Sequence, residues 1–306
     1  MSFSQDTKQE LSKINNLAKK NEVKLELIGY LISCNTTIIK GNNLRYSTEN
    51  EYNINRFAKL LNNLNIHYSI EMEGKLFVIK FIFKDDNYVK IEDKKIILNN
   101  EYILDELTKK TETTATNNRI IKDEEIKILV RGVFLGGGSI NNPENKYHLE
   151  LKFSNENNAN VIKNILQNFY INFKTLYKTN KYSLYLKDGE EISNFLALVG
   201  ANSAVLKFED IRVQREMRGK VNRLVNCKSA NLNKTLNASV EQIDAIKKLQ
   251  KTGKFNKLDD SLKEIANLRL ENPDMPLSEL GKLLTNPVGK SGVNYRLKKI
   301  IDIAKE

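Results

Sequence analysis

The sequence predicts an α+β domain made of a duplicated unit, followed by an all-α domain. An αββαββ-type pattern (helix, strand-like stretch, helix, strand pair) occurs twice before residue 211, and strand-like alternation stops after it. Positive charge then concentrates: residues 212–306 hold 20 Lys and Arg against 11 Asp and Glu, and residues 1–211 hold 29 against 27. A net charge of +9 in the last third points to a polyanionic partner, nucleic acid before membrane.

The first copy of the unit occupies residues 1–98. An apolar helical run at 23–34 is followed by a strand-like stretch at 37–46 and an amphipathic helix at 53–64. The segments IHYSIEM and LFVIKFIF then alternate or run apolar, as paired strands do.

The second copy occupies residues 122–211. An apolar helix begins near residue 125, YHLELKF alternates, and a helix is predicted at 157–170. FKTLYK and YSLYLK then flank a turn at 179–181, and a helix follows at 190–199. Gly29 and Gly132 occupy matching places in the two copies. The segment 99–121 is predicted to be a linker with one helix near 101–110.

The C-terminal domain, residues 212–306, reads as helices alone. A basic helix is expected to lead into an Asn-rich turn near residue 231, with Cys227 a small buried residue. Further helices are predicted at 240–250, 261–270, 277–284 and 291–304. Pro273, Pro276 and Pro287 lie between them, where helices must stop.

The string VRGVFLGGGS, residues 130–139, places Gly132 and Gly136 four residues apart on one helix face, and Gly29 and Ser33 share this spacing. Small residues allow two helix backbones to pack closely. The glycines at 136–138 suit either left-handed backbone at a helix end or a close approach. A phosphate-binding loop would precede its helix and carry a Lys, so packing is favoured over nucleotide binding.

These two helices resemble the LAGLIDADG motif of homing endonucleases, in which the eighth position is an Asp that ligates the catalytic Mg²⁺. The matching residues are Cys34 and Gly137. Glycine offers no ligand, and a thiol suits a hard cation poorly. The resemblance therefore implies a nuclease scaffold with no catalytic residues, no metal and no enzyme activity.

The chain as a whole resembles the WhiA family of bacterial regulators. The resemblance rests on MSFSQDTKQEL, RGVFLGGGSINNPENKYHLEL, NCKSANLNKT and PVGKSGVNYRLKKI. It implies a two-repeat degenerate LAGLIDADG domain joined to a helix-turn-helix. Family members act in sporulation control or are linked to cell division and chromosome segregation, so a DNA-binding transcriptional regulator is expected.

The helix-turn-helix is predicted at 276–306, with Ser291 as the cap of the recognition helix. Val293, Leu297, Ile300 and Ile301 repeat at core spacing. A solvated amphipathic helix would show the same pattern, but helix order, turn position and charge favour double-stranded DNA. The predicted DNA-binding residues are Ser278, Lys290, Ser291, Asn294, Tyr295, Arg296, Lys298 and Lys299.

A basic stripe precedes this motif. Its candidate phosphate contacts are Lys220, Arg223, Lys228 and Lys234. The stripe either follows the DNA backbone or is a linker that is basic only because its neighbour is, and spacing does not decide between them. His148 alternates outward on its strand. A lone exposed histidine on a sheet is usually just surface, and this one would touch DNA or a protein partner only if that sheet is used.

The remaining features exclude several classes. With two cysteines, two histidines and no CxxC or HExxH pattern, a structural zinc site is not expected. No apolar signal core or membrane-length stretch occurs, so we expect a cytoplasmic, nucleoid-associated protein without cofactor or small-molecule substrate. The alternatives are a protein-interaction or nucleoid-associated module with weak DNA binding, involving regulatory or division proteins as partners, and an active endonuclease.

Overall fold

A computed structural model describes residues 2–15, 17–84, 87–92, 95–99, 117–178 and 181–305. The chain divides into two compact units, Met1–Arg215 and Glu216–Glu306, and each is described by itself. The helix predicted at 101–110 lies outside the described residues.

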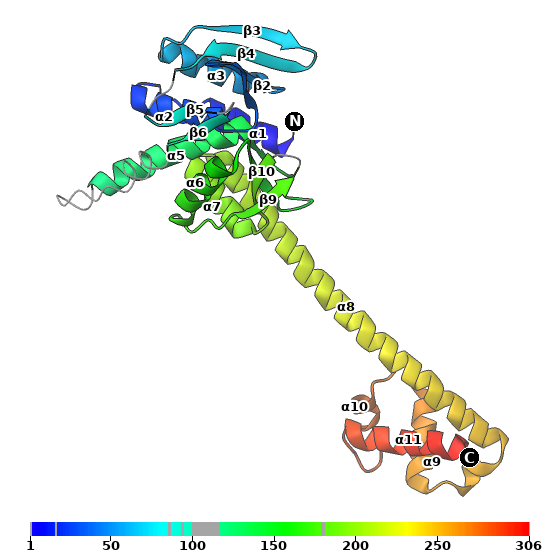
Figure 1. Cartoon of the computed structure of the whole chain (residues 1–306). Coiled ribbons are helices and arrows are strands. Elements are labelled where there is room, and N and C mark those ends of the chain that lie inside the picture. The colour runs from blue at the N-terminus through cyan, green and yellow to red at the C-terminus, as the bar shows by residue number, and fades with distance from the viewer. Residues whose placement is uncertain are drawn as a thin grey trace. The chain divides into compact units, whose positions relative to one another are not determined.

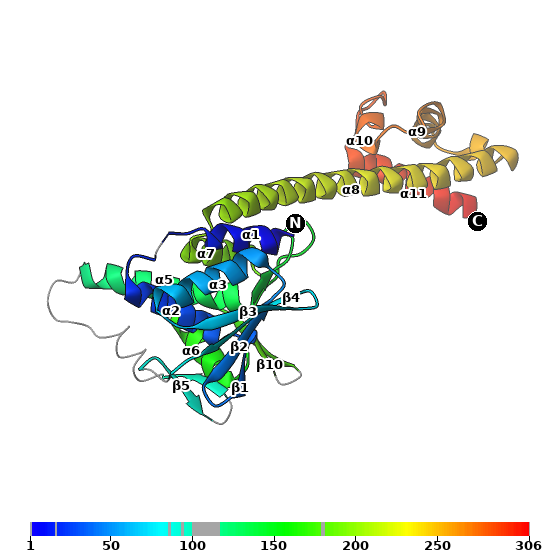
Figure 2. The same cartoon turned by 90° about the horizontal axis from the view of Figure 1, so that it is seen from above.

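The first repeat begins after an unanticipated helix, α1 (Phe3–Ser12), whose capping box pairs Ser2 with Gln5. Its strands form an antiparallel sheet in the order β1-β2-β4-β3, and α3 packs on β2 and β4 (Figure 2). The predicted single stretch at 37–46 is two strands, because Gly41, at φ +55°, turns the chain between them. The elements are α2 (Lys20–Leu31), β1 (Thr36–Lys40), β2 (Asn43–Thr48), α3 (Glu51–Asn63), β3 (Tyr68–Glu73) and β4 (Leu76–Ile82).

The second repeat has the same strand order, β7-β8-β10-β9, which confirms the predicted duplication. An unpredicted hairpin, β5 (Val89–Glu92) and β6 (Lys95–Leu98), follows β4 at the end of the predicted first copy, and the Asn158 side chain donates to the Ile96 carbonyl, 2.8 Å away. The elements of the repeat are α5 (Asn117–Gly137), β7 (Gly138–Ile140), β8 (Leu149–Phe153), α6 (Glu156–Gln167), β9 (Lys174–Lys178), β10 (Lys181–Leu186) and α7 (Gly189–Val199).

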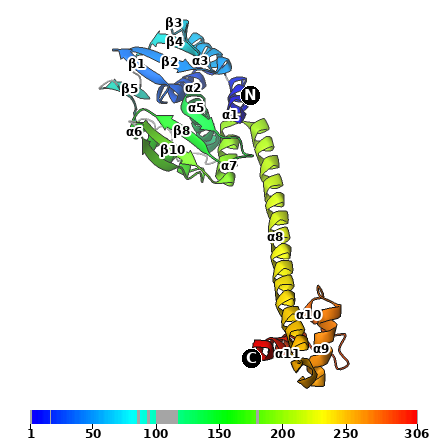
Figure 3. The same cartoon turned by 90° about the vertical axis from the view of Figure 1, so that its right-hand side faces the viewer.

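Helices α2 and α5 lie side by side where the two repeats meet (Figure 3). A Cβ added at Gly29 would lie 2.6 Å from the Val133 nitrogen, and one at Gly132 would overlap the Glu26 carbonyl oxygen. A Cβ at Gly136 would lie 2.6 Å from the Ser33 hydroxyl. The predicted small-residue interface is therefore confirmed. Gly136, Gly137 and Gly138 do not have a positive φ. The need for glycine at these positions therefore comes from close backbone approach and not from a left-handed backbone.

Helix α8 corrects the prediction of an Asn-rich turn. Residues Asn202–Lys251 form one helix, α8, so the segment 219–234 and the predicted helix at 240–250 are parts of it (Figure 1). Asparagine is a weak helix former, but no Gly or Pro occurs between residues 220 and 252 to force a break. The helix stops just before Gly253, whose φ of +69° is left-handed. Cys227, predicted to be buried, is exposed on α8.

After α8 the chain forms a short 3-10 turn (Lys254–Lys257). The remaining helices are α9 (Asp260–Glu271), α10 (Leu277–Leu280) and α11 (Lys290–Lys305). Pro273, Pro276 and Pro287 lie between helices, as predicted. The predicted helix at 277–284 ends early, at Leu280. The core of this unit is separate from that of the first and includes Ile246, Ile265, Leu280, Val293, Leu297 and Ile300.

Candidate nucleic-acid interface

Helices α10 and α11 meet through a glycine that the sequence analysis did not single out. A Cβ at Gly281 would overlap the Val288 carbonyl oxygen and lie 3.0 Å from a Val293 methyl. The Gly281 carbonyl accepts a hydrogen bond from the Val288 nitrogen, 3.1 Å away, which closes the turn. An isolated glycine near the end of a helical pattern was the available signal.

The turn is also held by α9. The backbone nitrogen and the hydroxyl of Thr285 both donate to one carboxylate oxygen of Glu264, at 2.6 and 2.7 Å. These hydrogen bonds hold the pKa of Glu264 below its ordinary value. Buried Arg269 donates to the carbonyls of Asn272, Pro273 and Met275, which ties the segment after α9 to the end of that helix. The contact of Glu264 with Thr285 joins residues 21 positions apart in the sequence, whereas the contacts of Arg269 are local.

Helix α11 begins at Lys290, so the prediction of Ser291 as its cap is wrong. The Gly289 carbonyl accepts the first helical hydrogen bond, from Val293 at 3.2 Å, and Ser291 lies inside the first turn. The one-residue difference leaves Val293, Leu297 and Ile300 buried, as predicted, while Ile301, the fourth residue of the predicted row, is half-buried. The residues of the opposite side, which we call the α11 polar face, are all exposed: Lys290, Ser291, Asn294, Tyr295 and Lys298.

Two predicted contact residues lie beside this face, toward α9. Arg296 is half-buried, and its charge helps to lower the pKa of Glu264. The Lys299 ammonium lies 3.8 Å from a carboxylate oxygen of Asp259, the residue preceding α9. Ser278 is exposed on α10. The predicted residues of α11 therefore form two groups. Those of the α11 polar face are exposed, while Arg296 and Lys299 lie near the carboxylates of Glu264 and Asp259.

The basic stripe lies along α8. Lys220, Arg223, Lys228 and Lys234 are all exposed, and no carboxylate occurs in the sequence between Glu216 and Glu241. Lys220 forms an ion pair with Glu216 at 2.8 Å, one helical turn away. The four basic residues are therefore exposed side chains of one continuous helix.

Cys34 and Gly137, which the sequence predicts to be vestigial nuclease positions, lie together at the ends of α2 and α5. A Cβ at Gly137 would lie 2.8 Å from the Lys152 carbonyl oxygen, and the Cys34 nitrogen donates to that oxygen at 3.0 Å. Burial raises the pKa of the Cys34 thiol. Within the described part of the chain, no cluster of three His, Cys, Asp or Glu side chains could hold a metal ion.

Lys8 lies near Cys34 and the end of α5, where a metal site would need a carboxylate. The Lys8 ammonium donates to the Leu135 carbonyl, 3.2 Å away, and lies 5.8 Å from the centre of the Phe134 ring. Burial lowers the pKa of Lys8 to about 8. An ammonium group, a thiol and a glycine do not fit the oxygen donors that Mg²⁺ requires.

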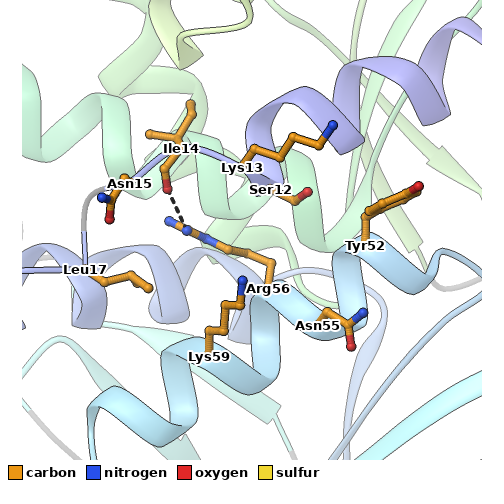
Figure 4. A pocket seen from close by; sticks show the side chains of 9 residues that line it. All are labelled: Ser12, Lys13, Ile14, Asn15, Leu17, Tyr52, Asn55, Arg56 and Lys59. Carbon is orange, nitrogen blue, oxygen red and sulfur yellow. Dashed lines mark hydrogen bonds between the residues drawn. The ribbon is translucent and has the colours of Figure 1, made fainter.

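A separate open cavity of about 470 Å³ lies between the end of α1 and one face of α3 (Figure 4). The guanidinium of Arg56, in the wall of this cavity, donates two hydrogen bonds to the carboxylate oxygens of buried Glu26, at 2.7 and 2.8 Å, and its charge is thereby neutralised. Arg56 also donates to the Ile14 carbonyl. No lining residue is acidic. No local sequence pattern predicts this pocket, because its walls come from two helices and the segment after α1. The lining residues are Ser12, Lys13, Ile14, Asn15, Leu17, Tyr52, Asn55, Arg56 and Lys59.

Across the described ranges, no helix is long and apolar enough to cross a membrane.

Comparison with known proteins gives consistent matches over the whole chain. A model of the WhiA LAGLIDADG-like domain matches residues 126–218, and a model of the WhiA C-terminal HTH domain matches residues 221–304. Relatives described as probable cell division protein WhiA are 36% identical in Clostridium tetani and 39% identical in Clostridium beijerinckii. Each alignment covers 100% of this chain and 98% of the relative.

Solved structures agree. The full-length DUF199/WhiA protein from Thermatoga maritima aligns with a TM-score of 0.60 and 26% identity, covering 100% of this chain and 98% of that one. The N-terminal LAGLIDADG domain of DUF199/WhiA aligns with a TM-score of 0.50 and 22% identity, covering 65% of this chain and 92% of that one. The predicted fold class, a duplicated LAGLIDADG-like domain followed by a helix-turn-helix domain, is confirmed.

Proposed function

The chain belongs to the WhiA family, and from this premise we propose that it is a DNA-binding transcriptional regulator, without nuclease activity, that acts in cell division, chromosome segregation or sporulation. The observation that carries the proposal is the α11 polar face, five exposed polar side chains on a helix whose other side is buried. A helix of this kind, packed against a preceding helix, is the element that helix-turn-helix proteins place in the major groove.

The residues of α10 and α11 have separate roles in this proposal. Asn294 lies on the α11 polar face, where its amide can pair with an adenine edge, and Arg296 is the second candidate for base contact. Lys290, Lys298 and Lys299 contact phosphates, and Ser278, Ser291 and Tyr295 border the same surface. Lys220, Arg223, Lys228 and Lys234 on α8 add phosphate contacts.

Absence of nuclease activity rests on the donor chemistry at the vestigial positions. Neither Cys34 nor Gly137 supplies a carboxylate, and the Lys8 ammonium lies beside them. A module that binds protein partners and touches DNA weakly is the second candidate, favoured by the small net charge of residues 1–211.

The test separates base contact from phosphate contact. Asn294→Ala, Arg296→Ala and Lys299→Ala are titrated on a preferred duplex, selected from genomic fragments, and on a scrambled one at two salt concentrations. Loss of a base contact should cost about 1–3 kcal/mol on the preferred duplex and little on the scrambled one. Loss of the Lys299 contact should weaken both duplexes alike and reduce the salt slope by about one unit.

Lys305→Ala serves as the matched control, since Lys305 is exposed at the far end of the same helix. Equal losses on both duplexes for all three variants would make α11 a phosphate anchor that reads no sequence. If none of them loses affinity, the helix-turn-helix proposal fails.

A further inference from the structure

The first sheet ends in β3, an edge strand whose outer side is open. β3 stands last in the strand order β1-β2-β4-β3, and β4 is its one partner among the described strands (Figure 1). Alternate residues of an antiparallel strand direct their N–H and C=O groups to opposite sides, so part of the β3 backbone faces away from β4. A row of such groups can pair with a strand of another chain.

The other edge strands of the two four-stranded sheets carry features that hinder such pairing. The register of β1 shifts between Ile38 and Lys40. Strand β7 has three residues, Gly138–Ile140, and β9 begins and ends with a lysine, Lys174 and Lys178. Irregular register, short edge strands and lysine side chains are means by which proteins keep the edges of their sheets from pairing.

Strand β3 has none of these features. Its six residues, Tyr68–Glu73, pair with β4 in a regular register, and the strand contains no Lys or Pro. Its two carboxylates are held by cations of the neighbouring strands. The Arg45 guanidinium lies 2.6 Å from a Glu73 oxygen, and the Lys80 ammonium forms an ion pair with Glu71. The charges that would repel a second strand are therefore balanced within the sheet.

The other face of β3 carries apolar side chains that remain exposed. Ile70 lies opposite Ile79, which is buried, so both belong to the face that α3 covers where it packs on β2 and β4. On β3 itself, however, 49% of Ile70 and 58% of Met72 are exposed. Tyr68 lies on the same face and is half-buried. The apolar surface of the first sheet thus continues to its open edge.

The sequence of β3 is complementary to itself when two copies run antiparallel with Ile70 at the centre. Ile70 then lies opposite Ile70 of the second copy, and Tyr68 lies opposite Met72 of the second copy. On the other face, His67, the exposed residue before the strand, lies opposite Glu73 of the second copy. Apolar pairs and a pair of opposite charge tendency are the cross-strand contacts that stabilise antiparallel strands.

The neighbouring register is less favourable. Pairing centred on Glu71 would place this carboxylate opposite its own copy, and like charges directly opposite each other are destabilising. Pairing through β3 also uses the same edge of both copies, so the assembly closes as a two-fold dimer. The edge left at the far side of each sheet is β1, whose register is irregular.

We propose that β3 pairs antiparallel with β3 of a second copy of this chain, centred on Ile70, and joins the two first sheets into one. This inference stands apart from the proposed function, because it requires no contact with DNA. A dimer would nevertheless carry two copies of α11, as two-fold helix-turn-helix proteins do.

The experiment measures the mass of the full chain by sedimentation velocity. An interface of one strand pair is small, so the protein is studied between about 1 and about 100 µM, where weak association is visible. The mass should rise with concentration from the 35.2 kDa of the monomer toward twice that value. A parent chain that stays monomeric throughout this range overturns the proposal, even if the edge binds a strand of another protein.

Ile70→Lys places a charge in the middle of the open edge and should weaken dimerisation at least about tenfold. The matched control is Leu176→Lys, because Leu176 lies in the middle of the edge strand β9 and is also 49% exposed. Circular dichroism checks that both variants fold. Equal weakening by the two variants, or an Ile70→Lys variant that associates like the parent, refutes pairing through β3.

A cross-link tests the register without depending on the lysine variant. Residues directly opposite each other on antiparallel strands have Cα atoms about 4.5–5.5 Å apart, within the reach of a disulfide. Ile70→Cys is made together with Cys227→Ser, since Cys227 is exposed. Air oxidation should give a disulfide-linked dimer on a non-reducing gel, and Leu176→Cys in the same background should not. A cross-link in both variants or in neither refutes the pairing centred on Ile70.

Discussion

Individual residues at the helix ends of the first unit leave little room for a carboxylate at position 137. Gly137 is buried, and any side chain would meet both the Lys152 carbonyl and Ser33 Cβ, 2.9 Å from an added Cβ. Lys8 already donates to a carbonyl of the same helix end. A carboxylate at position 137 would therefore need space that the packing of α2 on α5 does not provide.

The variant Gly137→Asp combined with Cys34→Asp should cleave no plasmid DNA with Mg²⁺ or Mn²⁺. Gly137→Asp alone should destabilise the first unit by about 1–3 kcal/mol, because overpacking forces the two helices apart. Nicking assays and thermal denaturation measure the two effects, and Cys34→Ser is the control, since it adds no volume. Metal-dependent cleavage by the double variant, abolished by EDTA, would contradict this account.

At the scale of elements, α8 is the clearest departure from the sequence expectation. Its 50 residues pass through Gly219 and the Asn-rich segment without interruption. An added Cβ at Gly219 has the Arg223 side chain at 3.4 Å as its nearest neighbour, which is an ordinary contact with a flexible group. Gly253, after the helix, has a left-handed backbone and open space around it.

Two glycine substitutions should therefore act in opposite directions. Gly219→Ala should raise the free energy of unfolding by about 0.5–1 kcal/mol, since alanine is the better helix former. Gly253→Ala should lower it by about 1 kcal/mol, because a residue with a Cβ is strained at positive φ. Chemical denaturation followed by circular dichroism measures both, and destabilisation by Gly219→Ala would mean that α8 is broken near that residue.

At the scale of the whole molecule, two cores support two units. Phe57 and Phe195 belong to the core of the first, and Leu280 and Leu297 to that of the second. Because the two sets of buried residues are separate, damage to one core removes contacts from that unit alone.

Leu280→Ala should destabilise the second unit by about 2–5 kcal/mol through lost burial and a residual cavity. Phe57→Ala, the reciprocal variant, should affect the first unit by about 3–5 kcal/mol. Hydrogen exchange resolved by peptide reports each unit separately. Loss of protection throughout the chain in both variants would show that the units unfold as one.

The sequence by itself determined the features that depend on local spacing. Alternation and helical periodicity predicted the duplicated αββαββ unit, the small residues at 29, 33, 132 and 136 predicted the α2–α5 interface, and the apolar row of α11 predicted its polar face. These patterns are local because burial on one side of a helix or strand repeats with the period of its backbone.

Only the tertiary structure decided the features that join distant residues. The closure of the turn on Gly281, the contact of Thr285 with Glu264, and the place of Lys8 beside α5 each depend on side chains brought together by packing. The continuity of α8 was undecided locally, because asparagine neither favours a helix strongly nor breaks it.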